Sequence, residues 1–205
     1  MNILIIIKKI LRRIIIGSKN KKRLKNKDFT IISNNCNGGV ILNELNQRFN
    51  TPTVNLFFEA EDYIKFLEKM SYYLNCELIE VKKSKIKYPI GKLDDITIHF
   101  MHYITFEDAK EKWNRRSLRI KKDNLFVMMT DRDGCTSEII NRFDKLHFEN
   151  KVIFTNREMK EIKSAFYIKG FENDEQVGEL SQFVSIFSLK KYYDQFDYVK
   201  WINKE

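Results

Sequence analysis

The sequence predicts an α/β fold of three layers, with a mostly parallel or mixed sheet and helices on both faces. From residue 29 onward, short apolar runs typical of buried strands alternate with longer segments of helical periodicity. Glycine and proline number only seven and two among 205 residues, which argues against flexible linkers. Hydrophobic residues make up 43% of the chain and suffice for a sizeable core, so we expect a single α/β domain over residues 29–205.

The first half of this domain is predicted to contain strands and helices in alternation. The apolar run Phe29–Ser33 predicts a strand, and the helix Val40–Phe49 follows it with its apolar residues on one face. Thr53–Phe58 predicts a second strand. The clearest helix is Asp62–Leu74, whose apolar residues form a wide stripe at helical spacing, and a short strand is expected over Glu77–Val81.

The second half continues the alternation. A strand is predicted over Ile96–Tyr103, and Thr105 can accept a hydrogen bond as the cap of the helix that follows. Leu125–Met129 is the most apolar predicted strand, and a helix follows it to about Leu146. The last predicted elements are strands over Val152–Phe154 and Ala165–Ile168 and an aromatic-rich helical region over Leu180–Trp201.

Charge is distributed unevenly along the chain. Of the 37 basic and 28 acidic residues, ten basic residues and one acidic residue lie within residues 1–28, which leaves 27 of each sign in the remainder. A nucleic-acid-binding surface would place basic residues across the fold, so we expect no nucleic-acid partner. The net charge of +9 instead marks residues 1–28 as a separate basic segment.

This segment begins MNILIIIKKILRRIIIG and is predicted to form an amphipathic helix. The apolar run before Lys8 is too short to span a bilayer, and the basic pair interrupts the apolar core that a signal peptide requires. We expect residues 1–28 to lie on an anionic membrane surface, as a peripheral anchor at the inner face of the plasma membrane. The alternative is a helix packed on the domain with its basic face in solvent.

The chain has three cysteines, Cys36, Cys76 and Cys135. Their odd number and the lack of a secretory signal predict free thiols in a reducing, cytoplasmic compartment. No pair has C-x-x-C spacing, so no structural zinc site is expected.

Two polar segments are expected to meet at one edge of the sheet. SNNCNGG (33–39) follows the first predicted strand, and TDRDGCT (130–136) follows the strand that ends at Met129. Parallel strands bring their carboxyl ends to the same edge, where open α/β sheets bind ligands. The sequence therefore predicts a functional site there, and the alternative is that both segments are ordinary connections.

The first segment offers groups for acyl transfer. Cys36, near a helix start, could act as a nucleophile, whereas most free cysteines are packed apolar residues. Ser33 is an alternative nucleophile, and His102 is the candidate general base near the end of its predicted strand. The candidate groups for holding the substrate or an oxyanion are Asn34, Asn35, Gly38 and Gly39.

The second segment offers a different chemistry. Asp131 and Asp133 form an Asp-x-Asp pair at the end of the most apolar strand. Two carboxylates at this spacing can hold a divalent cation and the phosphates of a nucleotide sugar. They can equally cap the turn and the helix after it, and the sequence leaves both interpretations open.

Seven blocks of the chain together resemble a known family. They are ISNNCNGG, TPTVNLFF, YPIGKLDDITIHFMHY, NLFVMMTDRDGC, KVIFTN, IKSAFYIKGF and YYDQFDYVKWIN. Over about residues 29–203 they follow the pattern of domain-of-unknown-function family 1919, whose members are often labelled as bacterial exopolysaccharide-biosynthesis proteins. The resemblance implies an α/β fold and assigns no catalytic residue. Asn37 stands where relatives usually have Trp, and Asn156 stands where many have His. Residue 156 therefore cannot supply a base here.

These observations predict a transferase for a cell-surface polysaccharide, acting on a sugar or a lipid-linked sugar at the cytoplasmic membrane face. An acyltransferase would use acetyl-CoA, with Cys36, Ser33 or His102 in the roles given above. A glycosyltransferase would use a nucleotide sugar and a divalent cation held by Asp131 and Asp133. The third hypothesis is a non-enzymatic accessory protein that docks biosynthetic partners through its C-terminal aromatic residues.

Overall fold

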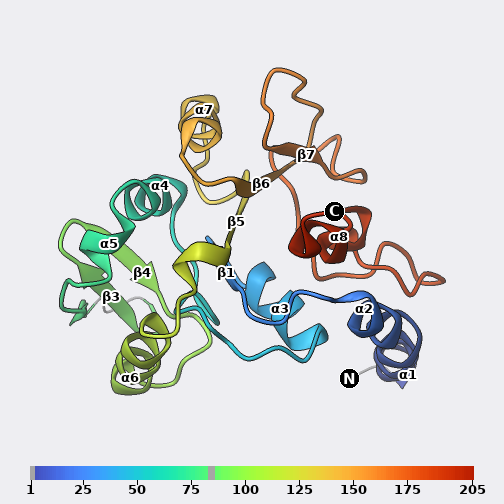
Figure 1. Cartoon of the computed structure of the whole chain (residues 1–205), viewed down its shortest axis with the longest axis horizontal. Coiled ribbons are helices and arrows are strands. Elements are labelled where there is room, and N and C mark those ends of the chain that lie inside the picture. Colours follow the sequence, from blue (N-terminus) through green and yellow to red (C-terminus); the bar gives the residue numbers. More distant parts are fainter. Residues whose placement is uncertain (1–2, 83–85) are drawn as a thin grey trace.

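The computed structural model describes residues 3–82 and 86–205, and within them a sheet of four parallel strands lies at the centre of the molecule (Figure 1). The strands, in spatial order, are β1 (Thr30–Ser33), β5 (Leu125–Thr130), β6 (Asn150–Thr155) and β7 (Ala165–Tyr167). Every residue of β1 and β5 is buried, which explains their continuous apolar runs, because parallel strands are covered on both faces.

Helices cover both faces of this sheet, and Figure 1 shows them in two groups with the sheet between them. Alternate residues of a strand point to opposite faces, so Ile32 and Val127 enter one core whereas Ile31 and Phe126 enter the other. The first core is covered by α4 (Ala60–Glu68), α5 (Met70–Tyr73), α6 (Phe106–Ser117) and α7 (Ser137–Lys145), and the second by α3 (Asn37–Glu44) and α8 (Tyr198–Asn203). The predicted α/β class is confirmed.

A small antiparallel sheet extends the first layer. Its strands, in spatial order, are β2 (Ile79–Glu80), β3 (Ile90–Leu93) and β4 (Ile96–His99). Phe57 pairs with His99 of β4 in a single isolated bridge. The prediction of a strand over 53–58 is therefore wrong, because Leu56 and Phe58 are buried as core anchors without a neighbouring strand along that segment.

Two predicted helices also differ from the structure. The helix expected over 62–74 divides at Lys69, whose backbone (φ −128°, ψ 39°) leaves the helical region between α4 and α5. The region 180–201 is largely irregular and contains one 3₁₀ turn, η3 (Tyr192–Gln195), before α8 begins. Its aromatic and apolar residues suggested a helix, but Leu180 and Tyr193 enter the second core as separate anchors of an irregular segment.

Two helices begin at a threonine whose hydroxyl caps the first turn, and the sequence predicts the first of these caps. The Thr105 hydroxyl accepts a hydrogen bond from the backbone N–H of Asp108 (3.2 Å) and so begins α6 as expected. Thr136 caps α7 in the same way through the N–H of Ile139 (3.3 Å). A 3₁₀ turn, η2 (Lys122–Asn124), leads into β5.

The N-terminal segment is a continuous helical run that packs on the domain through polar side chains. Lys8 donates to the carbonyl oxygen of Ser185 (2.8 Å), and Asn20 donates to the hydroxyl of Tyr198 (2.7 Å). The run consists of α1 (Ile3–Arg12), the π-helical turn η1 (Arg13–Gly17) and α2 (Ser18–Arg23).

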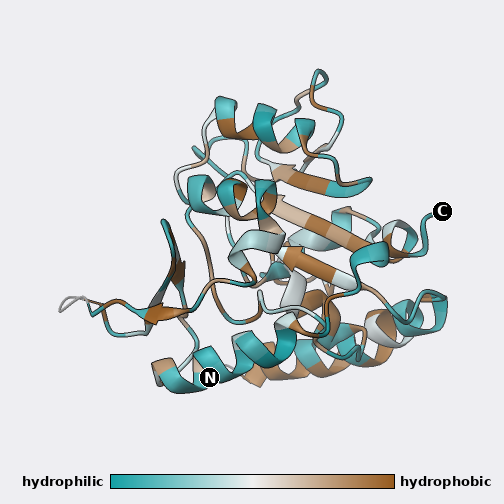
Figure 2. Ribbon diagram, turned by 60° about the vertical axis from the view of Figure 1, so that its left-hand side comes forward, coloured by the Kyte–Doolittle hydropathy of each residue, from teal (hydrophilic) through white to brown (hydrophobic). Residues whose placement is uncertain are grey.

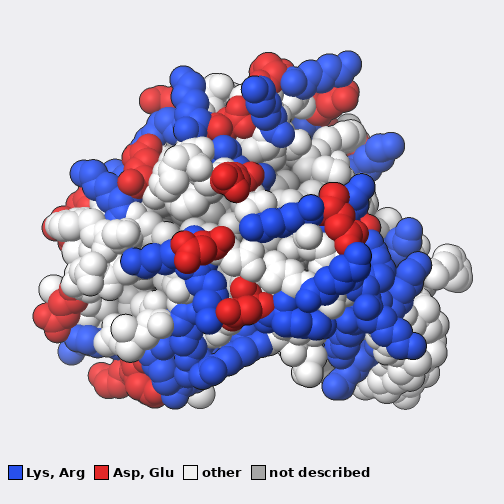
Figure 3. Space-filling model, in the orientation of Figure 1, with Lys and Arg blue, Asp and Glu red and all other residues white. Residues whose placement is uncertain are grey.

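The apolar face of this helical run points away from the domain. Nine Ile and Leu side chains between Ile3 and Ile15 are exposed in the described part of the chain. Figure 2 shows α1 as a mostly hydrophobic ribbon along the lower edge of the molecule, and Figure 3 shows uncharged atoms there beside a dense group of Lys and Arg. Among the described residues, no helix is long and apolar enough to cross a membrane.

Candidate functional site

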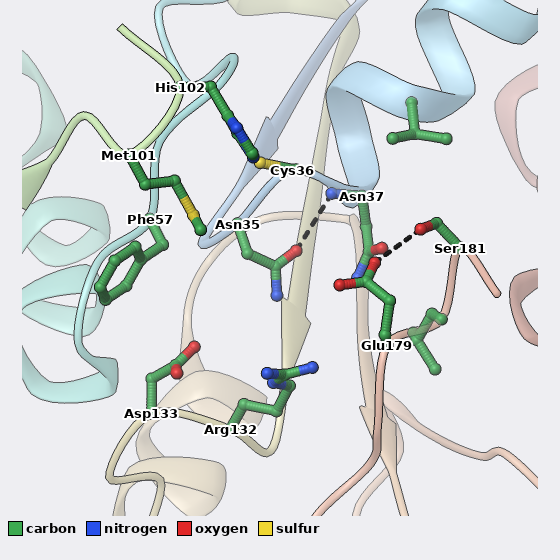
Figure 4. A pocket seen from close by; sticks show the side chains of 12 residues that line it. Asn35, Cys36, Asn37, Phe57, Met101, His102, Arg132, Asp133, Glu179 and Ser181 are labelled. Carbon is green, nitrogen blue, oxygen red and sulfur yellow. Dashed lines mark hydrogen bonds between the residues drawn. The ribbon is translucent and has the colours of Figure 1, made fainter. Parts of the chain in front are cut away.

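A cavity of about 510 Å³ opens at the carboxyl ends of β1 and β5 (Figure 4). Because β1 and β5 pair in parallel, the turns that follow them lie at the same edge of the sheet. Asn35, Cys36 and Asn37 line the cavity from the first turn, and Arg132 and Asp133 line it from the second. The two polar segments therefore meet as their positions in the sequence predict.

Other segments of the chain also line this cavity, among them the one that contains Phe57. The loop after β4 contributes Met101 and His102, and the irregular segment before η3 contributes Glu179 and Ser181. The hydroxyl of Ser181 donates a hydrogen bond to Glu179 Oε1 (2.6 Å), drawn as a dashed line in Figure 4. Sequence reasoning missed Glu179 and Ser181, because they belong to no periodic element and reach the cavity only through the tertiary fold.

Asn34 and Asn35 have different roles although they are adjacent. Asn34 is fully buried, and its Oδ1 accepts a hydrogen bond from the backbone N–H of Thr130 (3.2 Å), which ties β1 to β5. Asn35 donates from Nδ2 to Thr130 Oγ1 (2.9 Å) and accepts at Oδ1 from the backbone N–H of Asn37 (3.1 Å). Asn35 is thereby held at the cavity wall, whereas Asn34 is a structural residue inside the sheet.

Ser33 and the two glycines do not face the cavity. Ser33 is fully buried, and its Oγ has no hydrogen-bond partner among the described residues. A Cβ added to Gly38 would lie 2.9 Å from Ser33 Cβ, and one added to Gly39 would lie 3.3 Å from Val54 Cγ1. The structure therefore corrects the prediction for Ser33, which a substrate cannot reach. Gly38 and Gly39 permit α3 to pack closely on the elements beneath it and form no phosphate cradle at the cavity.

Cys36 lines the cavity, but its environment keeps the thiol protonated. Burial and, secondly, the carboxylate of Glu179 raise its pKa to about 11. The sulfur lies 3.8 Å from the carbonyl oxygen of Leu56. With such a pKa, roughly one thiol in a thousand is ionised at about pH 8, so Cys36 is poorly suited to act as a nucleophile.

We expect Cys36 to react slowly with iodoacetamide, and its rate to rise about tenfold per pH unit up to about pH 10. The thiolate is the reactive form, and below the pKa its fraction increases tenfold per unit of pH. Mass spectrometry of the labelled peptides measures the rate, with Cys76, a half-buried thiol outside the cavity, as internal reference. A plateau of the Cys36 rate near neutral pH would contradict the raised pKa.

Asp131 and Asp133 lie in different environments. Both carboxylate oxygens of Asp131 accept backbone N–H groups, from Asn156 (2.8 Å) and Val177 (2.8 Å). Asp131 therefore fastens the turn after β6 and the C-terminal segment, and these contacts favour the turn-capping interpretation of the two that the sequence leaves open. Asp133 does line the cavity, where burial raises the pKa of its carboxyl group. Within residues 3–82 and 86–205, no group of three or more His, Cys, Asp or Glu side chains could hold a metal ion.

His102 is exposed at the mouth of the cavity, and Figure 4 shows its ring directed toward Cys36. Two hydrogen bonds anchor its loop to residues 54–55. The backbone N–H of His102 donates to the carbonyl oxygen of Asn55 (3.4 Å). The hydroxyl of Tyr103 donates to the carbonyl oxygen of Val54 (2.9 Å). The imidazole is thus presented by an anchored loop, as a general base requires.

The cavity combines groups that suit a sugar and an anionic donor. The amides of Asn35 and Asn37 can form hydrogen bonds with hydroxyl groups, and Phe57 provides an apolar wall for a sugar ring. Arg132 provides a guanidinium, which binds phosphate through paired hydrogen bonds. His102 is the group that can accept a proton from a bound hydroxyl.

Comparisons with known proteins cover this whole site. The family model described as "Domain of unknown function (DUF1919)" matches residues 6–203, so the match begins within α1 and spans every residue that lines the cavity. A Haemophilus influenzae protein described as "Uncharacterized protein" is 50% identical over 192 residues. That alignment covers 94% of this chain and 92% of the relative.

Proposed function

This chain belongs to the DUF1919 family, and we propose that it is an acyltransferase of bacterial cell-surface polysaccharide biosynthesis. The proposed reaction moves an acyl group from a thioester donor such as acetyl-CoA to a hydroxyl group of a sugar. The observation that carries the proposal is the placement of His102 in one cavity with two amides and a guanidinium. The polysaccharide role is inferred from the labels that proteins of this pattern often carry.

In the proposed reaction His102 acts as the general base. It accepts the proton of the sugar hydroxyl while the oxygen attacks the thioester carbonyl, the C–O bond forms, the C–S bond breaks and the proton passes to the leaving thiolate. Asn35 Nδ2 has a second N–H, besides the one given to Thr130, with which to stabilise the oxyanion. No step requires a thiolate at Cys36, in keeping with its raised pKa.

We also propose that the protein acts at the inner face of the plasma membrane. The loop 184–187 adds further exposed apolar side chains to the apolar face of α1 and η1, and its Phe187 is 98% exposed. Lys8 links the two segments, because its Nζ donates to Ser185 and lies 4.0 Å from the centroid of the Phe183 ring. Lys and Arg side chains flank this apolar surface (Figure 3), which favours anionic lipid as its partner.

A thermal-shift panel tests the proposed reaction. We expect acetyl-CoA to raise the Tm without a metal ion, since a ligand at about a hundred times its Kd stabilises the fold by about 2.7 kcal/mol. Arg132→Gln should reduce the shift, whereas Arg48→Gln, an exposed arginine outside the cavity, should retain it. A shift that requires manganese and a nucleotide sugar would contradict acyl transfer. No shift with either donor would favour the non-enzymatic accessory role instead.

A further inference from the structure

A second cavity, of about 310 Å³, lies between the N-terminal helical run and α3. Its wall is strongly basic, whereas the only acidic side chain among its described lining residues is Glu44. Figure 3 shows the dense group of Lys and Arg over α1 and α2 to which this wall belongs. The basic lining residues are Lys9, Arg12, Arg13, Lys21 and Lys191.

Glu44 offsets only part of the charge of this wall, and its carboxylate is held by three side chains of the protein. Its Oε1 pairs with Arg12 (2.8 Å), and its Oε2 accepts hydrogen bonds from the hydroxyls of Tyr193 (2.7 Å) and Tyr198 (3.2 Å). Asp194 binds the other side of the Arg12 guanidinium. The other four cations form no ion pair within the described part of the chain. Glu44 and Asp194 together offset only part of the charge of the five cations, so the cavity keeps an excess of positive charge.

We propose that this cavity binds the phosphate or diphosphate ester of a membrane lipid, and that the acceptor sugar is carried on such a lipid. The inference rests on the proposed function, since it names the carrier of the sugar that His102 would acylate. Three of the four unpaired cations, Lys9, Arg13 and Lys21, share one face of the N-terminal helical run, and the fourth, Lys191, precedes η3, so two separate parts of the chain direct them into one cavity. A phosphate group, with several charged oxygens, matches such a convergent set of donors.

The position of the cavity suits a lipid-linked substrate. Lys9 and Arg13 directly precede the exposed Ile10 and Ile14, so the phosphate site adjoins the apolar surface proposed to enter the membrane. Val40 of α3 lines both this cavity and the first one. The two cavities therefore adjoin at this side chain, and a sugar attached to the phosphate would extend toward the cavity that contains the proposed catalytic base.

Cosedimentation with vesicles tests the proposal on the full chain. One set of phosphatidylcholine vesicles contains a polyprenyl phosphate, and a second set contains phosphatidylglycerol at equal surface charge. We expect about tenfold tighter binding to the first set, and loss of this preference in Lys21→Gln/Lys191→Gln. The control Lys22→Gln/Lys190→Gln removes the same charge at neighbouring positions outside the cavity and should keep the preference.

Equal binding of the unsubstituted protein to both vesicle sets, or equal loss of preference in both double variants, would overturn the proposal. A Tm increase with inorganic pyrophosphate that only the cavity variant loses, without a vesicle preference, would assign a soluble phosphate and also overturn it. If the cavity variant fails to fold, Lys9→Gln against Lys19→Gln, both exposed, gives the same comparison. His102→Asn should bind like the unsubstituted protein, so a failure of transfer is distinguishable from a failure of this site.

Discussion

Replacement of Arg12 by methionine is expected to lower the free energy of unfolding by about 3–5 kcal/mol. The guanidinium is 3% exposed and binds Glu44 (2.8 Å) and Asp194 (2.5 Å). Burial opposes its charge, but the hydrogen bonds with Asp194 and Glu44 raise its pKa. Methionine keeps most of the side-chain volume, so the main cost arises from two largely buried carboxylates left without a cation.

Arg13→Met is the matched control for this prediction. Arg13 follows Arg12 in the same helical run, but its side chain is exposed and forms no ion pair among the described residues. We expect this substitution to change stability by no more than about 0.5 kcal/mol. Urea denaturation of the full chain measures both variants. A loss below about 1 kcal/mol for Arg12→Met would show that the helix is not held on the domain by this ion-pair cluster.

The sequence predicts the N-terminal helix but not which of its basic residues are buried against the domain and which are exposed. KKILRR presents Lys8, Lys9, Arg12 and Arg13 as two equivalent pairs. In the structure the first residue of each pair is buried against the domain and the second is exposed, where it lines the basic cavity together with the buried Arg12. The division is set by partners far along the chain, such as Asp194, which lies 182 positions from Arg12. A local pattern contains no such information.

The parallel sheet could be predicted because strands buried on both faces require continuous apolar runs, and Leu125–Met129 is such a run. The irregular segments could not be predicted, because an apolar composition indicates that a segment is buried but does not indicate which backbone hydrogen bonds it forms. Phe57 bridges to one residue although it belongs to an apolar stretch, and Leu180 and Tyr193 anchor a largely irregular segment although it is rich in aromatic residues.

The edge that carries the site could be predicted from topology alone, but the orientation of single side chains could not. Ser33 and Asn35 are two residues apart, as are Asp131 and Asp133, and in each pair only the second residue lines the cavity. Which residue faces the cavity depends on where the strand ends. The strand β1 ends at Ser33, and β5 ends just before Asp131. Residues two positions apart in a regular strand share a face, so the two members of each pair differ only because the backbone leaves the strand at that point, which the sequence does not mark.

His102→Asn is expected to lower kcat/KM for acyl transfer to the sugar by about 10²–10⁴-fold. Asparagine keeps a polar side chain of similar reach but cannot accept the proton of the attacking hydroxyl. Since His102 is exposed, its replacement should change the free energy of unfolding by no more than about 0.5 kcal/mol. Transfer of a labelled acetyl group from acetyl-CoA to a lipid-linked sugar in vesicles measures the rate.

Two control variants make this result specific to the base. His147→Asn changes an exposed histidine that lies outside the site cavity, and Cys36→Ala removes the thiol toward which the ring points; both should retain most of the activity. Loss of activity in Cys36→Ala with retention in His102→Asn would contradict direct transfer, because the acyl group would then pass through the sulfur. Cell-surface polysaccharide that is unchanged in cells carrying His102→Asn would assign the protein an accessory role, since an accessory protein does not need the base.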